Sequence, residues 1–486
     1  MAGHVTIDVL PDDVLLEIFH FYVDEALLYL KIDAWHTLVH VSRKWRCVVF
    51  DSPHRLRLRL FCSASTPVRE MLSIWPPLPI IIQQYDYTAS ESNEDNIIAV
   101  LEHPDRVCKV QLSDVPSLHL EKLLAAMQEP FPALTDLMLV TNDNTAPVIP
   151  DSFLGGFAPN LGTLRLTGIP IPFPGLRKLL LSATDLIDLH LDKIPHSGYF
   201  SPEAMVTCLS PLTRLQSLVV GFESPRSRPY RENRRPPPPT RTFLPSLHEL
   251  RFTGVSEYLE DLVARIDTLP LSRFEMTFFH QLIFDTPQLT QFLSRNSPRQ
   301  RVEAHDEARM TFSDSHVIVS LHGPFQYGLK SRISCKQSDW QLSALAQVCS
   351  SSFSHAYIST VEHLYILEDE FMQPRWQDNI ENGQWLELLH PFTAVKRLLL
   401  SQNFVSRIAP AFQELVGERA NEVLPALQSI FLEGLDPSGV VPKGIGQFVT
   451  ARHLSNHRIR GRIAVISWAR EPWCESCESW IGNPLS

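Results

Sequence analysis

The chain has 486 residues, of which 44% are hydrophobic and 20% charged, and its formal net charge at pH 7 is −11. A chain of this length is too long for one ordinary hydrophobic core, so we expect a very large domain or a small domain joined to a repeat array. The net negative charge argues against nucleic acid as a partner. No run of about 18 apolar residues predicts a membrane span, so we expect a cytoplasmic or nuclear protein whose eight cysteines are thiols.

The stretch LPDDVLLEIFHFY, residues 10–22, predicts a helix with one apolar stripe. Pro11 suits a first helical turn, and Asp12 and Asp13 favour the positive end of the helix dipole. Apolar residues then recur at three- and four-residue spacing: Val14, Leu15, Ile18, Phe19 and Tyr22.

A second patterned stretch, LVHVSRKWRCVVFDSP, spans residues 38–53 and predicts another helix. Its apolar stripe consists of Leu38, Val41, Trp45 and Val48. Residues 24–37 between the two stretches have room for a further short helix. A helical unit of roughly fifty residues buries little of its own surface, so we expect it to depend on a neighbouring domain or on a partner.

These two motifs, in this order and followed by LRLRL, resemble an F-box over about residues 5–60. The sequence departs from that family in its long spacer and in Ser42, where the family often has Cys. The resemblance implies a three-helix module that docks onto the Skp adaptor of cullin-RING ubiquitin ligases. It also implies that the docking residues are Leu10, Pro11, Leu15, Ile18, Phe19, Val41 and Trp45. The alternative is a helical pair that packs only on the rest of this chain.

Beyond a connecting and N-terminal cap segment predicted at residues 61–104, one pattern recurs through residues 105–470. Apolar residues occupy positions one, four and six of ten hexapeptides, which begin at Val107, Leu134, Leu161, Leu186, Leu215, Leu247, Leu271, Val361, Val395 and Leu427. Most intervals have room for one strand and one helix, and the long interval between residues 272 and 360 is expected to hold further degenerate repeats. The pattern resembles the leucine-rich repeat.

This resemblance predicts an α/β fold, in which a three-helix F-box is followed by an irregular leucine-rich-repeat horseshoe with a parallel sheet on its concave face. Irregularity is expected because few repeats carry the family's asparagine, Asn142 and Asn403 being the exceptions. An ordinary parallel α/β domain is the alternative. Residues expected on the concave face as target contacts are Lys109, Gln111, Asp136, Met138, Arg165, His190, Arg251 and Arg397.

Two further segments attract attention without predicting chemistry. A proline-rich stretch at about residues 224–242 is expected to be a disordered loop inside the repeat array. Residues 471–486 form a predicted tail in which Cys474 and Cys477 have half of a zinc-site spacing but no second pair nearby. No catalytic motif, metal site or cofactor loop is predicted.

Together the two resemblances imply a substrate-recognition subunit of an SCF-type ubiquitin ligase. Such a protein is not itself an enzyme; it would bind the Skp adaptor, and through it a cullin-RING ligase, while its repeats hold an unknown protein target. Two alternatives remain open: a leucine-rich-repeat scaffold that does not direct degradation, and an α/β enzyme with an unrecognised site.

Overall fold

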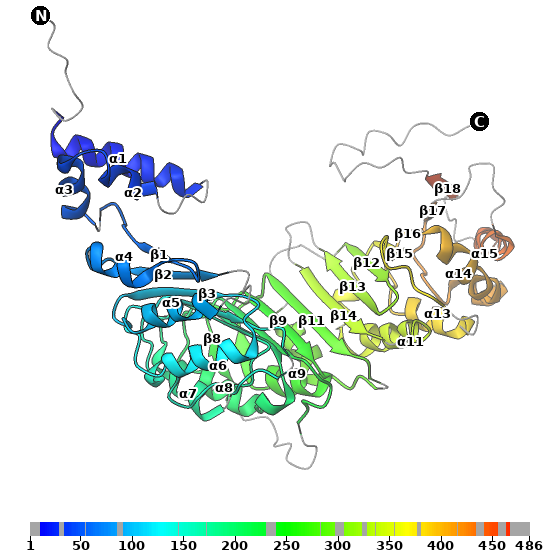
Figure 1. The fold of residues 1–486 in the computed structure, drawn as a ribbon. Coiled ribbons are helices and arrows are strands. Elements are labelled where there is room, and N and C mark those ends of the chain that lie inside the picture. Colours follow the sequence, from blue (N-terminus) through cyan, green and yellow to red (C-terminus); the bar gives the residue numbers. More distant parts are fainter. Residues whose placement is uncertain are drawn as a thin grey trace, which may run out of the picture. The chain divides into compact units, whose positions relative to one another are not determined.

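The computed structural model describes residues 10–28, 34–53, 55–84, 91–143, 145–171, 173–229, 240–281, 283–296, 306–322, 328–335, 337–353, 355–376, 381–415, 417–433, 442–454 and 463–466. The chain divides into two compact units. The first contains residues 1–254 and 265–269, and the second contains residues 255–264 and 270–486. Figure 1 shows both units and labels many of their helices and strands.

The first unit begins with a helical head made of α1 (Asp12–Leu28), α2 (Ala34–Val39) and α3 (Arg43–Asp51). The single helix predicted for residues 38–53 is therefore wrong, because the chain breaks between α2 and α3. Ser42 there is extended, and its hydroxyl accepts a hydrogen bond from Trp45 N at 3.2 Å, which caps α3. Leu38 consequently belongs to α2 and Val41 to the turn between the helices.

Eight strands of the first unit form a parallel sheet in the order β1-β2-β3-β4-β5-β6-β7-β9. Their bounds are β1 (Leu60–Cys62), β2 (Ile80–Gln84), β3 (Val107–Leu112), β4 (Asp136–Val140), β5 (Thr163–Thr167), β6 (Asp188–Ile194), β7 (Ser217–Phe222) and β9 (Glu249–Gly254). A separate pair joins β8 (Thr242–Leu244) to β10 (Ile266–Thr268). Within the segment at residues 61–104, predicted to connect the head to the repeats and to cap them, β2 and most of β1 extend the sheet at its end.

The helices that follow the head in the first unit cover one face of its sheet (Figure 1). They are α4 (Val68–Ile74), α5 (Glu91–Leu101), α6 (Ser117–Ala126), α7 (Phe173–Ser182) and α8 (Pro202–Leu209). The repeated apolar positions of the strands are buried; Leu164 and Leu166 of β5, for example, are at most 1% exposed. Most of the intervening strand residues are partly or fully exposed, buried Ile81 and Gly221 being exceptions, and they lie on the opposite face, called here the uncovered face.

The second unit contains a mixed sheet in the order β11-β14-β13-β12-β15-β16-β17-β18. The bounds are β11 (Arg273–Phe279), β12 (Glu307–Phe312), β13 (His316–His322), β14 (Gly328–Ser334), β15 (His363–Glu368), β16 (Arg397–Leu400), β17 (Ser429–Glu433) and β18 (Ile463–Ile466). Its helices are α9 (Ser256–Val263), α10 (Pro287–Asn296), α11 (Trp340–Gln347), α12 (His355–Ile358), α13 (Asn382–Leu389), α14 (Gln402–Glu414) and α15 (Lys443–Leu454).

All ten predicted repeat strands are present, but the long interval between residues 272 and 360 differs from the prediction. It contains β12, β13 and β14, which form an antiparallel meander rather than further strand–helix repeats. The meander is inserted in reverse order, so that β14 pairs in parallel with β11 and β12 pairs in parallel with β15. Each of its strands alternates buried and half-buried residues, the period-two pattern of antiparallel strands with one covered face.

Some expectations fall outside the described residues. These are the central part of the proline-rich loop, residues 230–239, and the tail that contains Cys474 and Cys477. Across the described ranges, no helix combines the length and the apolar character that a membrane crossing requires.

Candidate functional site

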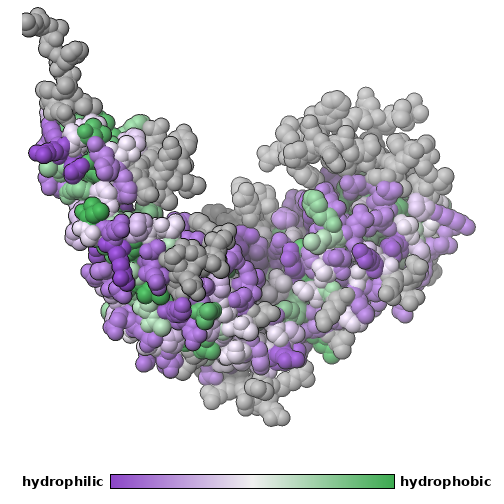
Figure 2. All heavy atoms as spheres, in the orientation of Figure 1, coloured by the Kyte–Doolittle hydropathy of each residue, from purple (hydrophilic) through white to green (hydrophobic). Residues whose placement is uncertain are grey.

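Helix α1 presents an apolar stripe to solvent. Val14, Ile18, Phe21 and Tyr22 follow one another at spacings that place them on one side of a helix, and each is at least 40% exposed. Val41, in the turn between α2 and α3, is 54% exposed. We call these five residues the apolar head surface; Figure 2 shows hydrophobic surface on the helical head.

The opposite side of α1 forms the core of the head. Leu15 and Phe19 are fully buried, and the rings of Phe19 and half-buried Trp45 lie 4.7 Å apart. The prediction that Leu15 and Phe19 contact the adaptor therefore needs correction, because a side chain that packs between the helices of its own head offers no surface to a partner. Their role in the described structure is to hold α1 on α3.

The other predicted docking residues lie at or near the outside of the head. Pro11, Ile18 and Val41 are exposed, whereas Leu10 is half-buried, and Lys44 Nζ donates a 2.7 Å hydrogen bond to the Leu10 carbonyl oxygen. The prediction missed Phe21, which is 71% exposed. Apolar residues occupy so much of the circumference of α1 that its sequence defines two stripes, and the packing of Trp45 decides which one faces inward.

Aromatic residues fix the head to the first strands of its own unit. Trp35 Nε1 donates a hydrogen bond to the Arg59 carbonyl oxygen at 3.0 Å, next to β1. The ring of His36 stacks on Trp75 with centroids 4.9 Å apart and planes 4° from parallel. The exposed stripe on α1 is therefore presented by a packed base rather than by an isolated helix.

The uncovered face of the first unit brings together seven of the predicted target contacts. Register places Gln111, Met138, Arg165, His190 and Arg251 in one row across β3, β4, β5, β6 and β9, with Val219 of β7 between the last two. A second row begins with Lys109 and Asp136, whose Nζ and Oδ2 atoms are 3.7 Å apart. Arg397 lies on β16 of the second unit and is exposed.

Charges in the first row are partly balanced by acids on the same strands. The guanidinium of Arg251 contacts the Glu249 carboxylate at 2.5 Å. Burial lowers the pKa of His190, Asp192 opposes this effect, and Arg165 and Arg251 add to it. His190 therefore contributes a neutral imidazole to the row at pH 7.

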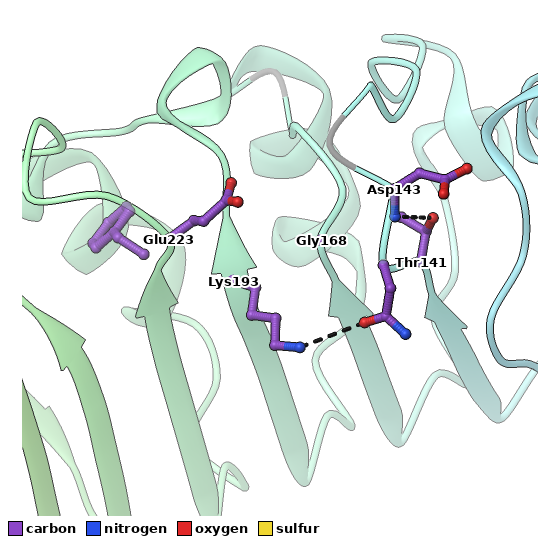
Figure 3. Close-up of a pocket in the computed structure, with 7 residues that line it drawn as sticks. Thr141, Asp143, Gly168, Lys193 and Glu223 are labelled. Atoms are coloured by element: carbon purple, nitrogen blue, oxygen red, sulfur yellow. Dashed lines mark hydrogen bonds between the residues drawn. The ribbon is translucent and has the colours of Figure 1, made fainter. Parts of the chain in front are cut away.

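A cavity of about 360 Å³ lies at the carboxyl ends of β4 to β7, lined by Thr141, Asn142, Asp143, Gly168, Lys193, Phe222 and Glu223 (Figure 3). Lys193 Nζ donates to Asn142 Oδ1 at 3.4 Å, and Asn142 Nδ2 donates to Asp114 Oδ1 at 2.5 Å. Asp143 accepts hydrogen bonds from the Ser117 amide and hydroxyl at the start of α6. These polar groups join successive repeats, so the cavity is a product of the repeat connections.

The two asparagines of the repeat pattern donate hydrogen bonds to carboxylates of the preceding repeat. Asn403 Nδ2 donates to Glu368 Oε2 at 2.5 Å, just as Asn142 reaches Asp114 one repeat earlier. Each side chain thus links its own repeat to the preceding one through a carboxylate.

A serine–histidine contact in the second unit has the residue types of a nucleophile and a general base. Ser313 Oγ lies 2.8 Å from His316 Nδ1, but Ser313 is fully buried and its hydroxyl also donates to the His316 carbonyl oxygen at 2.9 Å. These contacts close the turn between β12 and β13. Within the described ranges, no group of three or more His, Cys, Asp or Glu side chains is arranged to hold a metal ion.

Comparison with known proteins gives little beyond this geometry. Neither a family model nor a curated protein matches the chain. Among solved structures, 19 chains match. One is the leucine-rich repeat-containing protein LegL7 from Legionella pneumophila, which is 15% identical and aligns over 82% of this chain and 97% of that one with a TM-score of 0.28. The leucine-rich-repeat-like architecture rests on the strands and helices described above.

Proposed function

We propose that the protein is a substrate-recognition subunit of an SCF-type ubiquitin ligase. In this proposal the apolar head surface binds the Skp adaptor, and the uncovered sheet faces bind a target protein. The protein performs no chemistry of its own; it raises the effective concentration of target lysines near a ubiquitin-loaded enzyme.

The observation that carries the proposal is the exposed stripe on α1. Burying an exposed Val, Ile or Phe side chain contributes about 1.5–3 kcal/mol, so several of these residues together support a stable complex after the costs of association. Charged pairs flank the stripe: Lys44 with Asp12, and Arg55 with Glu17. An apolar centre with a polar rim is the usual composition of a protein–protein interface.

Co-expression with the Skp adaptor tests adaptor binding. We expect the full chain to co-purify with the adaptor at one-to-one stoichiometry, and the double variant Ile18→Asp, Phe21→Asp to lose the complex. Leu118→Asp on α6 is the matched control, because Leu118 is 65% exposed and lies outside the head. This variant should retain adaptor binding. Retention of the adaptor by the double variant would overturn the proposal.

A second assay separates this function from that of a scaffold that also binds the adaptor. Proteins that co-purify with the chain are added to a reconstituted ligase containing cullin, RING protein and ubiquitin-loaded enzyme. A target receptor increases ubiquitin transfer to these proteins, and the head double variant abolishes the increase. Stable capture without ubiquitin transfer would favour the scaffold, and no dependence on the adaptor would favour an α/β enzyme.

A further inference from the structure

The uncovered face of the second unit carries a concentration of positive charge. Its strands β11, β14, β12 and β16 place cationic side chains at alternating, half-buried or exposed positions: Arg273, Lys330, Arg332, Arg309 and Arg397. We call these five residues the basic band. The acidic side chains at described, equivalent positions of this sheet are Glu275, Glu307 and, on β17, Glu433, so the five cations outnumber them.

Only part of this charge is neutralised. Arg273 donates to Glu275 at 2.7 and 3.0 Å, and Arg309 lies 3.4 Å from Glu307 and 5.6 Å from the centre of the Tyr365 ring. Lys330, Arg332 and Arg397 have no hydrogen-bonded or ion-paired acid among the described residues. Among the described residues, Lys330 and Arg332 on β14 and Arg397 on β16, four strands further along the sheet, are thus available to an anionic ligand.

The first unit provides an internal comparison. Its uncovered face carries Lys109, Arg165 and Arg251 on β3, β5 and β9, but it also carries Asp136 on β4, Asp188 and Asp192 on β6, and Glu249 on β9. Acids thus balance or exceed bases there. The excess of cations is a property of the second unit's sheet and not of uncovered strand faces in this chain generally.

Two histidines belong to the same face and respond to its charge. His322 and Glu307 are register partners, as are Glu307 and His363. Burial lowers the pKa of both histidines. At His363, Arg397 adds to the effect while Asp306, Glu362 and Glu307 oppose it; at His322, Arg309 and Lys330 add to it while Glu307 opposes it. A bound anion would favour the protonated form of both rings.

We propose that the basic band binds an extended polypeptide segment rich in negative charge, supplied by Asp and Glu carboxylates or by phosphorylated Ser and Thr. Calling this segment part of the ligase target rests on the proposed function; the binding itself does not. Lys330 and Arg332 are two residues apart on β14, hence about 7 Å, which matches the spacing of alternate side chains in an extended peptide.

The surroundings of the band favour a polypeptide over nucleic acid. Glu275 and Glu307 interrupt the cations and would repel a continuous phosphate backbone, and the chain as a whole has a net charge of −11. Half-buried Leu399, Leu367 and Ile318 lie on the same face and provide apolar contacts for the side chains of a peptide.

The test uses the purified full chain and three fluorescent peptides of identical length, each with four variable positions. These positions hold serine, glutamate or phosphoserine, and binding is followed by fluorescence anisotropy at several salt concentrations. We expect the glutamate or the phosphoserine peptide to bind and the serine peptide to bind at least about tenfold more weakly, with affinity falling as salt rises. A preference for phosphoserine over glutamate would identify phosphate as the natural source of charge.

Matched charge variants locate the site. The double variant Lys330→Gln, Arg332→Gln should weaken binding roughly tenfold or more, whereas Arg177→Gln, Lys178→Gln removes the same charge from exposed positions of α7 and should leave binding nearly unchanged. Equal losses in both would overturn the proposal, as would indifference to peptide charge or tighter binding of a single-stranded RNA of equal charge. The head variant Ile18→Asp, Phe21→Asp should bind these peptides normally, so failure of adaptor binding and failure of this inference are separate results.

Discussion

The rings of Phe19 on α1 and Trp45 on α3 pack with their centroids 4.7 Å apart and their planes tilted by 54°. This contact determines which side of α1 faces the head core, because Phe19 is fully buried while Ile18, its neighbour in sequence, is 42% exposed. The apolar side chains of α1 thus have two roles: those on one side stabilise the head core, and those on the other side form an exposed surface.

Substitution of Phe19 by alanine should loosen the head specifically. Loss of a buried Phe side chain leaves a cavity and costs about 3–5 kcal/mol. We expect hydrogen exchange in residues 12–23 and 43–51 to accelerate, with little change in the strands of the first unit. Phe21→Ala, on the same helix but largely exposed, should leave exchange unaltered; equal acceleration in both variants would contradict this division of roles.

Gly168, which follows β5, is predicted to tolerate no side chain. Its φ is +75°, and a Cβ atom would overlap the Thr141 carbonyl oxygen. Gly168→Ala should lower the free energy of unfolding of the first unit by at least about 1–3 kcal/mol, measured by chemical denaturation. Gly446→Ala is the contrasting variant: it lies in α15 with open space at its Cβ, and alanine should stabilise the helix by about 0.5–1 kcal/mol.

Glu260 caps a neighbouring helix in the second unit. Its side chain is 3% exposed, and its oxygens accept hydrogen bonds from the amides of Gln288 and Leu289 in the first turn of α10. Glu260→Ala leaves these donors buried without their acceptor and should destabilise the second unit by about 1–3 kcal/mol in calorimetry. Glu121→Ala, at an exposed position of α6, should change stability by less than about 0.5 kcal/mol.

The stability of the first unit should depend on pH through His190. Burial lowers its pKa in the fold, with Asp188, Asp192, Arg165 and Arg251 as the charged neighbours. The unfolded chain therefore binds the proton more readily, and stability should fall as pH drops from about 7.5 through the unfolded value near 6.5 toward 5.5. Thermal unfolding of His190→Gln should show a shallower decline over this window than the natural chain; identical declines would exclude His190 as a contributor.

The parallel strands could be predicted from the sequence because their pattern is local. Leucines at positions one, four and six, as in Leu161, Leu164 and Leu166, define the buried side of a strand without knowledge of its neighbours. The same register gives the uncovered positions, so Arg165 and His190 were predicted to share a face, and the structure pairs them directly.

Other features depend on contacts between distant segments and could not be predicted in this way. The assignment of Leu15 and Phe19 to the core requires knowing where Trp45 packs. The meander required recognising period-two alternation, visible in GLKSRIS at residues 328–334, in a region searched for a different repeat. That alternation was also the signal that could have placed Lys330 and Arg332 together on an uncovered face.

The reversed order of β12, β13 and β14 has a consequence for synthesis of the chain. β14 pairs with β11 although residues 280–327 separate the two strands. During synthesis, the edge of β11 that pairs with β14 therefore stays unpaired until residue 334 has left the ribosome. Nascent chains that end within the meander would expose unpaired backbone groups on a strand rich in phenylalanine. Chains that end within the meander are therefore expected to aggregate more readily than chains that extend past residue 334.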